Sequence, residues 1–425
     1  MTIAPDLDCQ VPALVLRCNR DIFPYGTLGV IRSLGRAGVE VHCVLEGPHA
    51  SAAWSRHLHC AHPWLPAPSE PAALLAGLAS LADRIGRPAV LIAVDDPGAI
   101  FIAEHGAELA SMFLLPRPDP LLPLSLADKA DLAAICGRLG IPQPATEVPS
   151  SMTDVAAAVA RLGLPLMAKW SRPWLLPHDA GLSSTTVVQT AAEAAELFAA
   201  AQWAGSRLVL QRHIPVTPTG DWFFHGYFDQ NSACLYGGTG RKLRDYPPDA
   251  GITTLGRWLP NRHVYDAAVR LAADIGYRGL LDLDFRYDAL AGTYQLLDFN
   301  PRLGAQFRLF SDAGGLDVVR AMHLDLTGRS VPPARPRYGR GFVVENYDAL
   351  SVIRRRLQGR RSPTGWLRPL RGVGESAWFA FDDPAPFAAM SVRWLALGLR
   401  RLRQSRSRPA GRGRVPALAQ PDPRR

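Results

Sequence analysis

The chain has 425 residues, 48% of them hydrophobic, and its 47 lysines and arginines outnumber its 38 acids to give a net charge of +9. This composition excludes collagen-like, disordered and disulfide-scaffold proteins as descriptions of the whole chain. Its length and apolar content suffice for two to four structural units with buried cores.

Targeting and redox signals favour a cytoplasmic protein. No run of eighteen uncharged apolar residues occurs, so we expect no transmembrane helix. Residues 1–9 lack both the positive charge and the apolar core of a signal peptide. The six cysteines are scattered and form no CxxC pair, which fits a reducing compartment and neither a zinc knuckle nor a disulfide framework.

The basic residues are unusual in kind and in position. Only Lys129, Lys169 and Lys242 are lysines, so a lysine here either survives by chance or occupies a place where the wide fork of arginine does not fit. Residues 1–330 hold 27 basic and 32 acidic side chains, whereas residues 331–425 hold 20 arginines and 6 acids. The acidic body argues against nucleic acid as a partner, and the basic tail leaves contact with an anionic surface open.

The N-terminal part predicts a doubly wound α/β domain over residues 10–118. A buried strand at Ala13–Leu16, a helix near 27–37 and a strand near 39–45 form a βαβ unit, and a helix near 72–85 and a strand near 89–94 continue it. Ligands of such sheets bind at the carboxyl ends of strands. Arg20, Asp95 and Asp96 are therefore substrate-site candidates, with ordinary polar loop residues as the alternative.

The middle part, residues 119–330, alternates helices and strands. A proline-rich connection precedes a helix from Leu126 to Leu139, for which Ser125 is the predicted cap and Gly140 the end. Further helices are expected near 153–162, 191–202 and 264–274. Strands are expected at 166–170, 186–189 and 208–211, and residues 222–239 alternate strands and turns.

A hairpin of carboxylates is the most informative local pattern. Two apolar strands, 280–287 and 293–299, are joined by a turn near Gly292. If the hairpin is centred on residue 291, Asp284 lies opposite Asp298 and Asp282 lies opposite Asn300, all on one face. Like charges across a sheet need neutralising, and hard oxygen ligands in this arrangement suit Mg²⁺. The alternative is a solvated polar face.

Arg302 follows this hairpin directly, after Pro301 ends the strand. A cation at this point can stabilise a phosphate or a developing oxyanion. Arg308 follows a few residues later and is a second candidate for a cation beside the carboxylate cluster.

Four motifs follow one another along the chain: Asp128-Lys129 twelve residues before Ile141-Pro142, Leu164 to Lys169, Leu208 to Pro215, and Leu297 to Arg302. In this order they resemble ATP-grasp enzymes of the carboxylate–amine ligase type, similar to the ATP-grasp domains of carbamoyl-phosphate synthase large chains and D-aspartate ligases. The resemblance covers roughly residues 10–330. It implies an N-terminal doubly wound α/β pre-ATP-grasp domain, a two-lobed ATP-grasp domain over 119–330 (small lobe about 140–210, large lobe about 211–330) and a basic helical C-terminal extension.

The resemblance also implies roles for the site residues. Lys129 and Lys169 would contact the phosphates of ATP, with the loop 179–185, including Ser183 and Ser184, closing over them. The remaining implied nucleotide contacts are Gln211, Arg212, His213, Ile214 and Asp221. Mg²⁺, with Mn²⁺ as an alternative, would be held by Asp284, Asp298 and Asn300. Arg302, Lys242 and Arg244 would act on the transferred phosphate and the carboxylate substrate.

This sequence departs from the family pattern at three places. Asp284 and Asp298 are aspartates, whereas the first two metal ligands of the family are usually glutamates. The shorter aspartate side chain can alter the geometry around the metal. Arg212 stands where the hinge commonly carries a glutamate, which makes Asp221 one candidate for the ribose or adenine contact. The phosphate loop is also poorer in glycine than usual.

The implied reaction is attack of a carboxylate on the γ-phosphate of ATP, followed by displacement of phosphate by an amine. Phosphoryl transfer needs positioning and charge neutralisation, and the chain carries neither a GxSxG nucleophile motif nor a P-loop. Two alternatives stay open. One is an ATP-grasp kinase with a hydroxyl acceptor, and the other is a nucleotide-binding scaffold without turnover.

The C-terminal extension, residues 331–403, is predicted to be basic and helical. Apolar residues recur in it at helical spacing among arginines: Phe387, Met390, Trp394, Leu397 and Leu402. Such a helix either lies on the anionic inner face of a membrane or packs on the catalytic body with a solvated arginine face. From about residue 404 to 425 we expect disorder, because Ser, Arg, Pro and Gly dominate.

Overall fold

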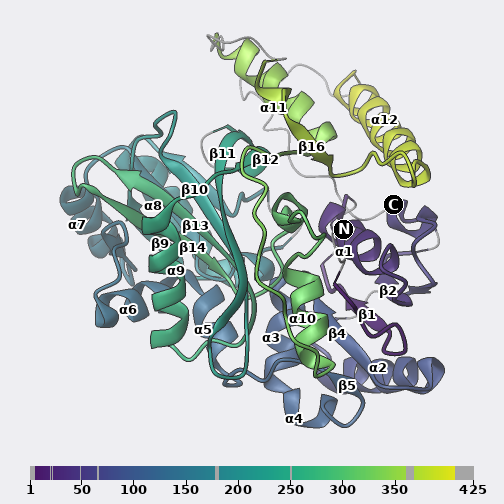
Figure 1. The fold of residues 1–425 in the computed structure, drawn as a ribbon. Coiled ribbons are helices and arrows are strands. Elements are labelled where there is room, and N and C mark those ends of the chain that lie inside the picture. Colours follow the sequence, from purple (N-terminus) through teal and green to yellow (C-terminus); the bar gives the residue numbers. More distant parts are fainter. Residues whose placement is uncertain are drawn as a thin grey trace.

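The protein is described from a computed structural model, which covers residues 5–19, 21, 23–47, 49–64, 67–177, 181–248, 251–359 and 368–406, without the side chains of 400–406. It is an α/β structure, as predicted, and the described residues form three sheets (Figure 1). Among the described helices, none has both the length and the apolarity that crossing a membrane requires.

The first sheet is formed by the N-terminal part and is entirely parallel, in the order β3-β2-β1-β4-β5. Its strands are Ala13–Leu16 (β1), Val41–Leu45 (β2), Cys60–Pro63 (β3), Ala89–Ala93 (β4) and Phe113–Leu114 (β5). The helices of this part are Tyr25–Gly35 (α1), Pro71–Ile85 (α2), Asp96–Glu104 (α3) and Gly106–Leu109 (α4), with a short 3-10 turn Ser51–Trp54 (η1). The strand order reverses between β1 and β4, where ligands of doubly wound sheets bind.

Two helices connect this sheet to the rest of the chain, where the sequence predicts one. Leu122–Ala127 (α5) ends at Asp128, whose carboxylate caps Lys129–Leu139 (α6) by accepting from the backbone N–H groups of residues 130 and 131. The prediction of a single helix from Leu126 to Leu139, capped by Ser125, is therefore wrong. The extended backbone of Asp128 interrupts the helix, and its side chain satisfies the free N–H groups of the next one.

The second sheet has four strands in the order β6-β9-β7-β8. These are Thr146–Glu147 (β6), Leu166–Trp170 (β7), Thr185–Val188 (β8) and Leu208–Arg212 (β9), with helices Met152–Leu162 (α7) and Ala191–Ala204 (α8). The neighbours of β7, namely β8 and β9, are both antiparallel to it.

The third sheet has seven strands in the order β14-β13-β10-β11-β12-β15-β16. They are Asp221–Phe228 (β10), Cys234–Tyr246 (β11), Ile252–Trp258 (β12), Gly279–Asp288 (β13), Thr293–Asn300 (β14), Gly341–Val343 (β15) and Val373–Ser376 (β16). Helices Arg262–Asp274 (α9) and Val318–Leu326 (α10) and 3-10 turns Phe307–Phe310 (η3) and Arg368–Leu370 (η4) accompany it. Two of its strands, β15 and β16, come from the C-terminal extension, so the extension is built into the main sheet.

The extension also contains helices Glu345–Leu357 (α11) and Ala385–Arg406 (α12) (Figure 1). Met390 of α12 is buried, and Phe387, Trp394 and Leu397 pack against a core cluster that includes residues of β1, α1, α10 and β12. These four predicted apolar residues of α12 are thus used within the molecule, which agrees with the packing alternative. The side chain of Leu402 lies outside the described residues. Residues 404–406 continue the helix, and the predicted disorder of 407–425 lies outside the described residues.

A buried ion pair fastens the extension to the N-terminal part. The guanidinium of Arg32 (α1) donates to the carboxylate of Asp383 at 2.8 Å and to the carbonyl of Trp378 at 2.7 Å, and both charged side chains are at most 1% exposed. Ser55 donates to the same carboxylate at 2.7 Å. The domain boundaries at 118 and 330 remain predictions, because one core cluster spans all three parts.

Candidate active site

The carboxylate hairpin has the predicted register. Asp284 pairs with Asp298 and Asp282 pairs with Asn300 across β13 and β14. The opposite face of the hairpin carries Leu281, Leu283 and Phe299, which are buried against α9. This burial fixes the register, since a slip by one residue would turn the acids into the core.

Two of the three lysines meet at one carboxylate. Lys129, the first residue of α6, places its Nζ 2.9 Å from Asp298. Lys169 on β7 places its Nζ 3.3 Å from both oxygens of Asp298 and donates to the carbonyl of Leu297 at 2.8 Å. The two side chains come from α6 and the second sheet, so the hairpin joins both elements to the third sheet.

Two buried ammonium groups share this one carboxylate. Burial opposes ionisation of Asp298, but Lys129 and Lys169 hold its pKa well below the ordinary value. Burial, together with the neighbouring Lys129, lowers the pKa of Lys169 despite its contact with Asp298. One carboxylate therefore serves two ammonium groups, and an additional anion would stabilise both.

The third lysine meets the other carboxylate of the pair. Lys242 on β11 lies 2.7 Å from Asp284. Burial and the neighbouring Asp282 and Asp298 raise the pKa of Asp284, although Lys242 opposes the shift. A divalent cation would offset the cost of keeping Asp284 ionised at this buried position.

Arg244 lies apart from Lys242. Its Nε is 2.9 Å from Asp348 of α11, and the side chain is 10% exposed. A register shift between residues 242 and 244 interrupts the pairing of β11 with β12, so the two side chains do not share the face that regular alternation predicts. The structure thus places Lys242 against the hairpin and Arg244 against the C-terminal extension.

Arg302 joins the hairpin to the N-terminal sheet. Its guanidinium lies 2.9 Å from Asp282 and 3.4 Å from Asp96, the first residue of α3. His225 on β10 lies 3.1 Å from the other oxygen of Asp282 and is 1% exposed. Burial opposes ionisation of Asp282, yet His225 and Arg302 lower its pKa. Sequence reasoning missed His225, whose distance in sequence from the hairpin gives no local signal.

The neighbouring Asp95 has a structural role. Its carboxylate accepts backbone N–H groups of Cys18 and Asn19 at 2.7 Å and of Gly98 at 2.9 Å, so it caps α3 and holds the loop after β1. Arg20 in that loop lies outside the described residues. Of the two described candidates from the first sheet, the structure brings Asp96 to the hairpin through Arg302.

A pocket opens between the second and third sheets, beside these ion pairs. Its walls combine charged side chains, among them Lys169, Lys242 and Asp298, with apolar side chains and hinge residues. The further lining residues used below are Pro144, Met167, Gln211, Arg212, Ile214, Asp221, Asp284, Arg286 and Leu297.

The predicted hinge residues line one wall of this pocket. Gln211 donates to Thr146 at 3.0 Å, and Arg212 pairs with Asp288. Asp221 is paired with Arg286, whose Nε and a terminal nitrogen donate to it at 2.5 and 3.1 Å. The sequence did not point to Arg286, because only the pairing of β10 with β13 reveals that it faces Asp221.

The remaining predicted residues lie around the pocket and outside its lining. Ser183 and Ser184 are exposed before β8, and the carbonyl of Ser184 accepts the N–H of Trp170 beside Lys169. His213 is half-buried after β9. The amide of Asn300 contacts Asp282 at 3.4 Å. Arg308 is buried and pairs with Glu375 of β16, so the structure places it with the extension.

Comparison with known proteins supports the resemblance drawn from the motifs. No family model matches the chain. A D-aspartate ligase of Enterococcus faecium (strain Aus0004) is 24% identical over 240 residues, which are 54% of this chain and 57% of that protein. The chain therefore spans somewhat more than half the length of this curated relative.

Solved structures resemble a larger share of the chain. An ADP complex of N5-carboxyaminoimidazole ribonucleotide synthetase has a TM-score of 0.59 at 12% identity and covers 83% of this chain and 86% of its own. An L-amino acid ligase from Bacillus licheniformis has a TM-score of 0.58 at 13% identity, covering 77% and 78%. A biotin carboxylase domain of 2-oxoglutarate carboxylase from Hydrogenobacter thermophilus has a TM-score of 0.56 at 16% identity, covering 78% and 73%.

These neighbours define the fold. The chain has the fold of ATP-grasp carboxylate–amine ligases, and the resemblance predicted from its four motifs is confirmed. By sequence it is similar to the D-aspartate ligase of Enterococcus faecium.

Proposed function

We propose that this protein is an ATP- and Mg²⁺-dependent ligase that joins a carboxylate to an amine. The observation that carries the proposal is the convergence of all three lysines, from α6, β7 and β11, on the paired carboxylates of one hairpin. In a chain with 44 arginines, three lysines at one site are selected for a compact charge.

The pocket fits a nucleotide. Met167, Ile214 and Leu297 form an apolar surface on which a purine ring can lie, with Gln211 at its edge. Lys169 lines the same pocket and donates to the carbonyl of Leu297 on the hairpin at 2.8 Å. When a triphosphate enters, its oxygens would replace the shared carboxylate as partners of Lys129 and Lys169, and the additional anion would favour the charged form of Lys169.

The carboxylates fit a magnesium ion. Asp284 and Asp298 are hard oxygen donors directly opposite each other, and burial, together with the neighbouring Asp282 and Asp298, raises the pKa of Asp284. A bound cation would favour the ionised form of this carboxylate. Asp284, Asp298 and Asn300 would hold the ion, which supplies charge neutralisation to the phosphates.

The chemistry that we propose has two displacements. A carboxylate oxygen of the first substrate attacks the γ-phosphorus, the bond to the bridging oxygen breaks, and ADP leaves. The amine nitrogen of the second substrate then attacks the acyl carbon, phosphate leaves, and the nitrogen releases a proton to form the amide. No bond to a protein atom is needed in either step.

Residues of this chain bear the charge that develops in both steps. Arg302 is held by Asp282 and Asp96 at the mouth of the hairpin, where a fixed guanidinium stabilises the transferred phosphate and the oxygen of the acyl group. Lys242, which lies on β11, neutralises the charge of the incoming carboxylate or of the γ-phosphate. His225 keeps Asp282 in place and does not reach the pocket lining.

The substrate class is suggested by the relatives. One is a D-aspartate ligase and another an L-amino acid ligase, so amino acids are the first compounds to test as acid or amine. The experiment measures ADP release with pairs of amino acids, and mass spectrometry identifies the product. Amide formation that needs both partners supports the ligase, whereas a phosphorylated hydroxyl product would establish the kinase alternative.

Variants separate the proposed site from general damage. Lys169→Ala and Asp298→Ala should each lower turnover by about 10²–10³-fold or more while the fold is retained. Arg161→Ala is the matched control, because Arg161 is 59% exposed in a surface pair with Glu147. ATP binding without turnover for any acid–amine pair would favour the scaffold alternative.

A further inference from the structure

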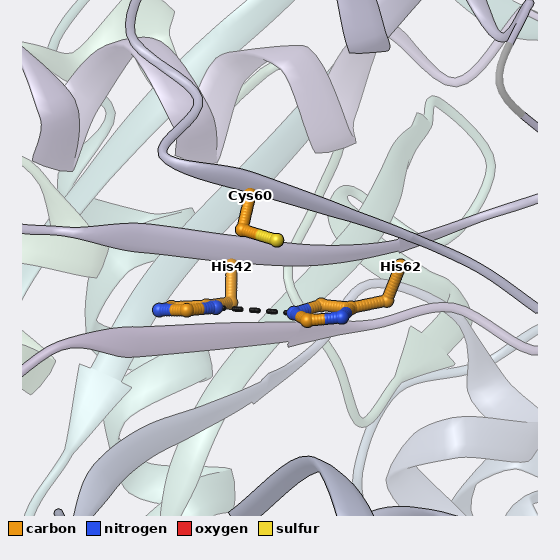
Figure 2. Close-up of side chains that lie close together, drawn as sticks. All are labelled: His42, Cys60 and His62. Carbon is orange, nitrogen blue, oxygen red and sulfur yellow. Dashed lines mark hydrogen bonds between the residues drawn. The ribbon is translucent and has the colours of Figure 1, made fainter. Parts of the chain in front are cut away.

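Three metal-ligating side chains gather on one face of the first sheet, away from the proposed ATP site. His42 lies on β2, and Cys60 and His62 lie on β3. The parallel register pairs His42 with Cys60 and residue 44 with His62, so all three side chains project from the same face. Figure 2 shows the two imidazoles side by side and the sulfur pointing toward the same space.

The donor atoms are close enough for one ion. The ligand atoms of His42, Cys60 and His62 all lie within 4.8 Å of one another, and Nδ1 of His42 is 3.0 Å from Nε2 of His62. The two histidines are 8% and 6% exposed. The sulfur of Cys60 has one weak contact, 3.7 Å to the carbonyl of Ala61. Small rotations of the three side chains bring the donors to the roughly 2.0–2.3 Å bonds of tetrahedral zinc.

The donor set selects the metal. One thiolate and two imidazoles suit Zn²⁺, whereas Mg²⁺ takes oxygen ligands. A second set that shares His42, formed with Glu40 and His59, is less suited, because Glu40 is engaged by Arg87 at 2.5 Å.

We propose that His42, Cys60 and His62 form a zinc site with three protein ligands. The fourth position faces a pocket that is lined by the cluster itself and by Trp64 and Ser80, the latter on α2. An open fourth position is the arrangement in which zinc binds water or an exchangeable ligand. The ion also joins β2 to the edge strand β3, so its binding stabilises that edge.

The site is independent of the proposed ligase chemistry. The order β3-β2-β1-β4 puts β1 between the cluster and β4, which leads to Asp96. Binding can therefore be measured without nucleotide or substrates, and a failure here leaves the ligase proposal untouched.

The test uses the full chain, purified without a polyhistidine tag, stripped with a chelator and titrated with Co²⁺. We expect about one equivalent to bind with a thiolate-to-cobalt charge-transfer band in the near ultraviolet, and Zn²⁺ to displace it. Added Zn²⁺ should also raise the melting temperature of the stripped protein. Inductively coupled plasma mass spectrometry then counts zinc in protein purified from zinc-supplemented cells.

Two variants identify the ligands. Cys60→Ser should abolish the charge-transfer band and weaken binding by about 100-fold or more, and His62→Gln should weaken it similarly while circular dichroism stays unchanged. Cys9→Ser and His263→Gln, at exposed positions, are matched controls that should bind like the wild type. The proposal is overturned if the wild type shows no thiolate band, or if the band persists without Cys60.

Discussion

The replacement of Lys169 by arginine tests most directly whether the lysines are selected for their shape. The Nζ of Lys169 lies 2.8 Å from the carbonyl of Leu297 and 3.3 Å from both oxygens of Asp298, and the side chain is 8% exposed. A guanidinium keeps the charge but is wider and planar. At such a closed position it must displace its neighbours or turn away from the phosphates.

The expected magnitude follows from this geometry. Overpacking of a buried position costs about 1–3 kcal/mol, and a displacement of about 1 Å at a positioning group costs about 10²-fold in rate. We therefore expect Lys169→Arg to lower kcat/KM for ATP by about 10²-fold, which corresponds to about 3 kcal/mol of transition-state stabilisation. The stability of the protein should fall by no more than the overpacking cost.

The assay is steady-state ADP release over a range of ATP concentrations, with urea unfolding of the same preparations. Arg161→Lys makes the reverse exchange in an exposed ion pair. It should change neither the transition-state stabilisation nor the free energy of unfolding by more than about 0.5 kcal/mol. A Lys169→Arg variant that retains kcat/KM within about threefold, or less than 1 kcal/mol, would refute the argument that a point charge is required.

Three further predictions concern buried contacts that hold the fold together. Asp383→Asn leaves the buried Arg32 uncompensated and should lower the free energy of unfolding by about 3–5 kcal/mol in urea titrations, against about 1 kcal/mol for Asp382→Asn, whose carboxylate is 48% exposed. Although burial opposes ionisation, the ion pair lowers the pKa of Asp383, so the wild-type advantage should be complete above about pH 4 and shrink as the pH falls through the lowered pKa. Gly304→Ala puts a methyl group 2.2 Å from the His225 ring and should lower the melting temperature, whereas Gly137→Ala on open helix surface should leave it equal or higher.

The carboxylate hairpin illustrates what local sequence determines. Alternation of acids with Leu281, Leu283 and Phe299, together with a short turn, fixes both the register and the face, because one face must be buried. Local sequence likewise determines the buried face of the helices and strands whose apolar residues are regularly spaced. The three lysines were identifiable because the rest of the chain uses arginine.

Irregular backbone limited the prediction within the site. The resemblance gave Lys242 and Arg244 a common role, and nothing in the sequence marks the register shift that separates them. The break at Asp128 was missed for a similar reason, since the apolar spacing of the two helices is nearly continuous across it.

The sequence by itself determined the class of fold, the hairpin and the set of cations, because these depend on neighbours within one strand pair or one motif. Only the tertiary structure decided that Asp96 and His225 support the hairpin and that the C-terminal extension joins the main sheet. It alone also brings His42 to Cys60. Each of these contacts joins strands or helices far apart in the chain, and hydrophobic burial shared among several elements selects which of them become neighbours.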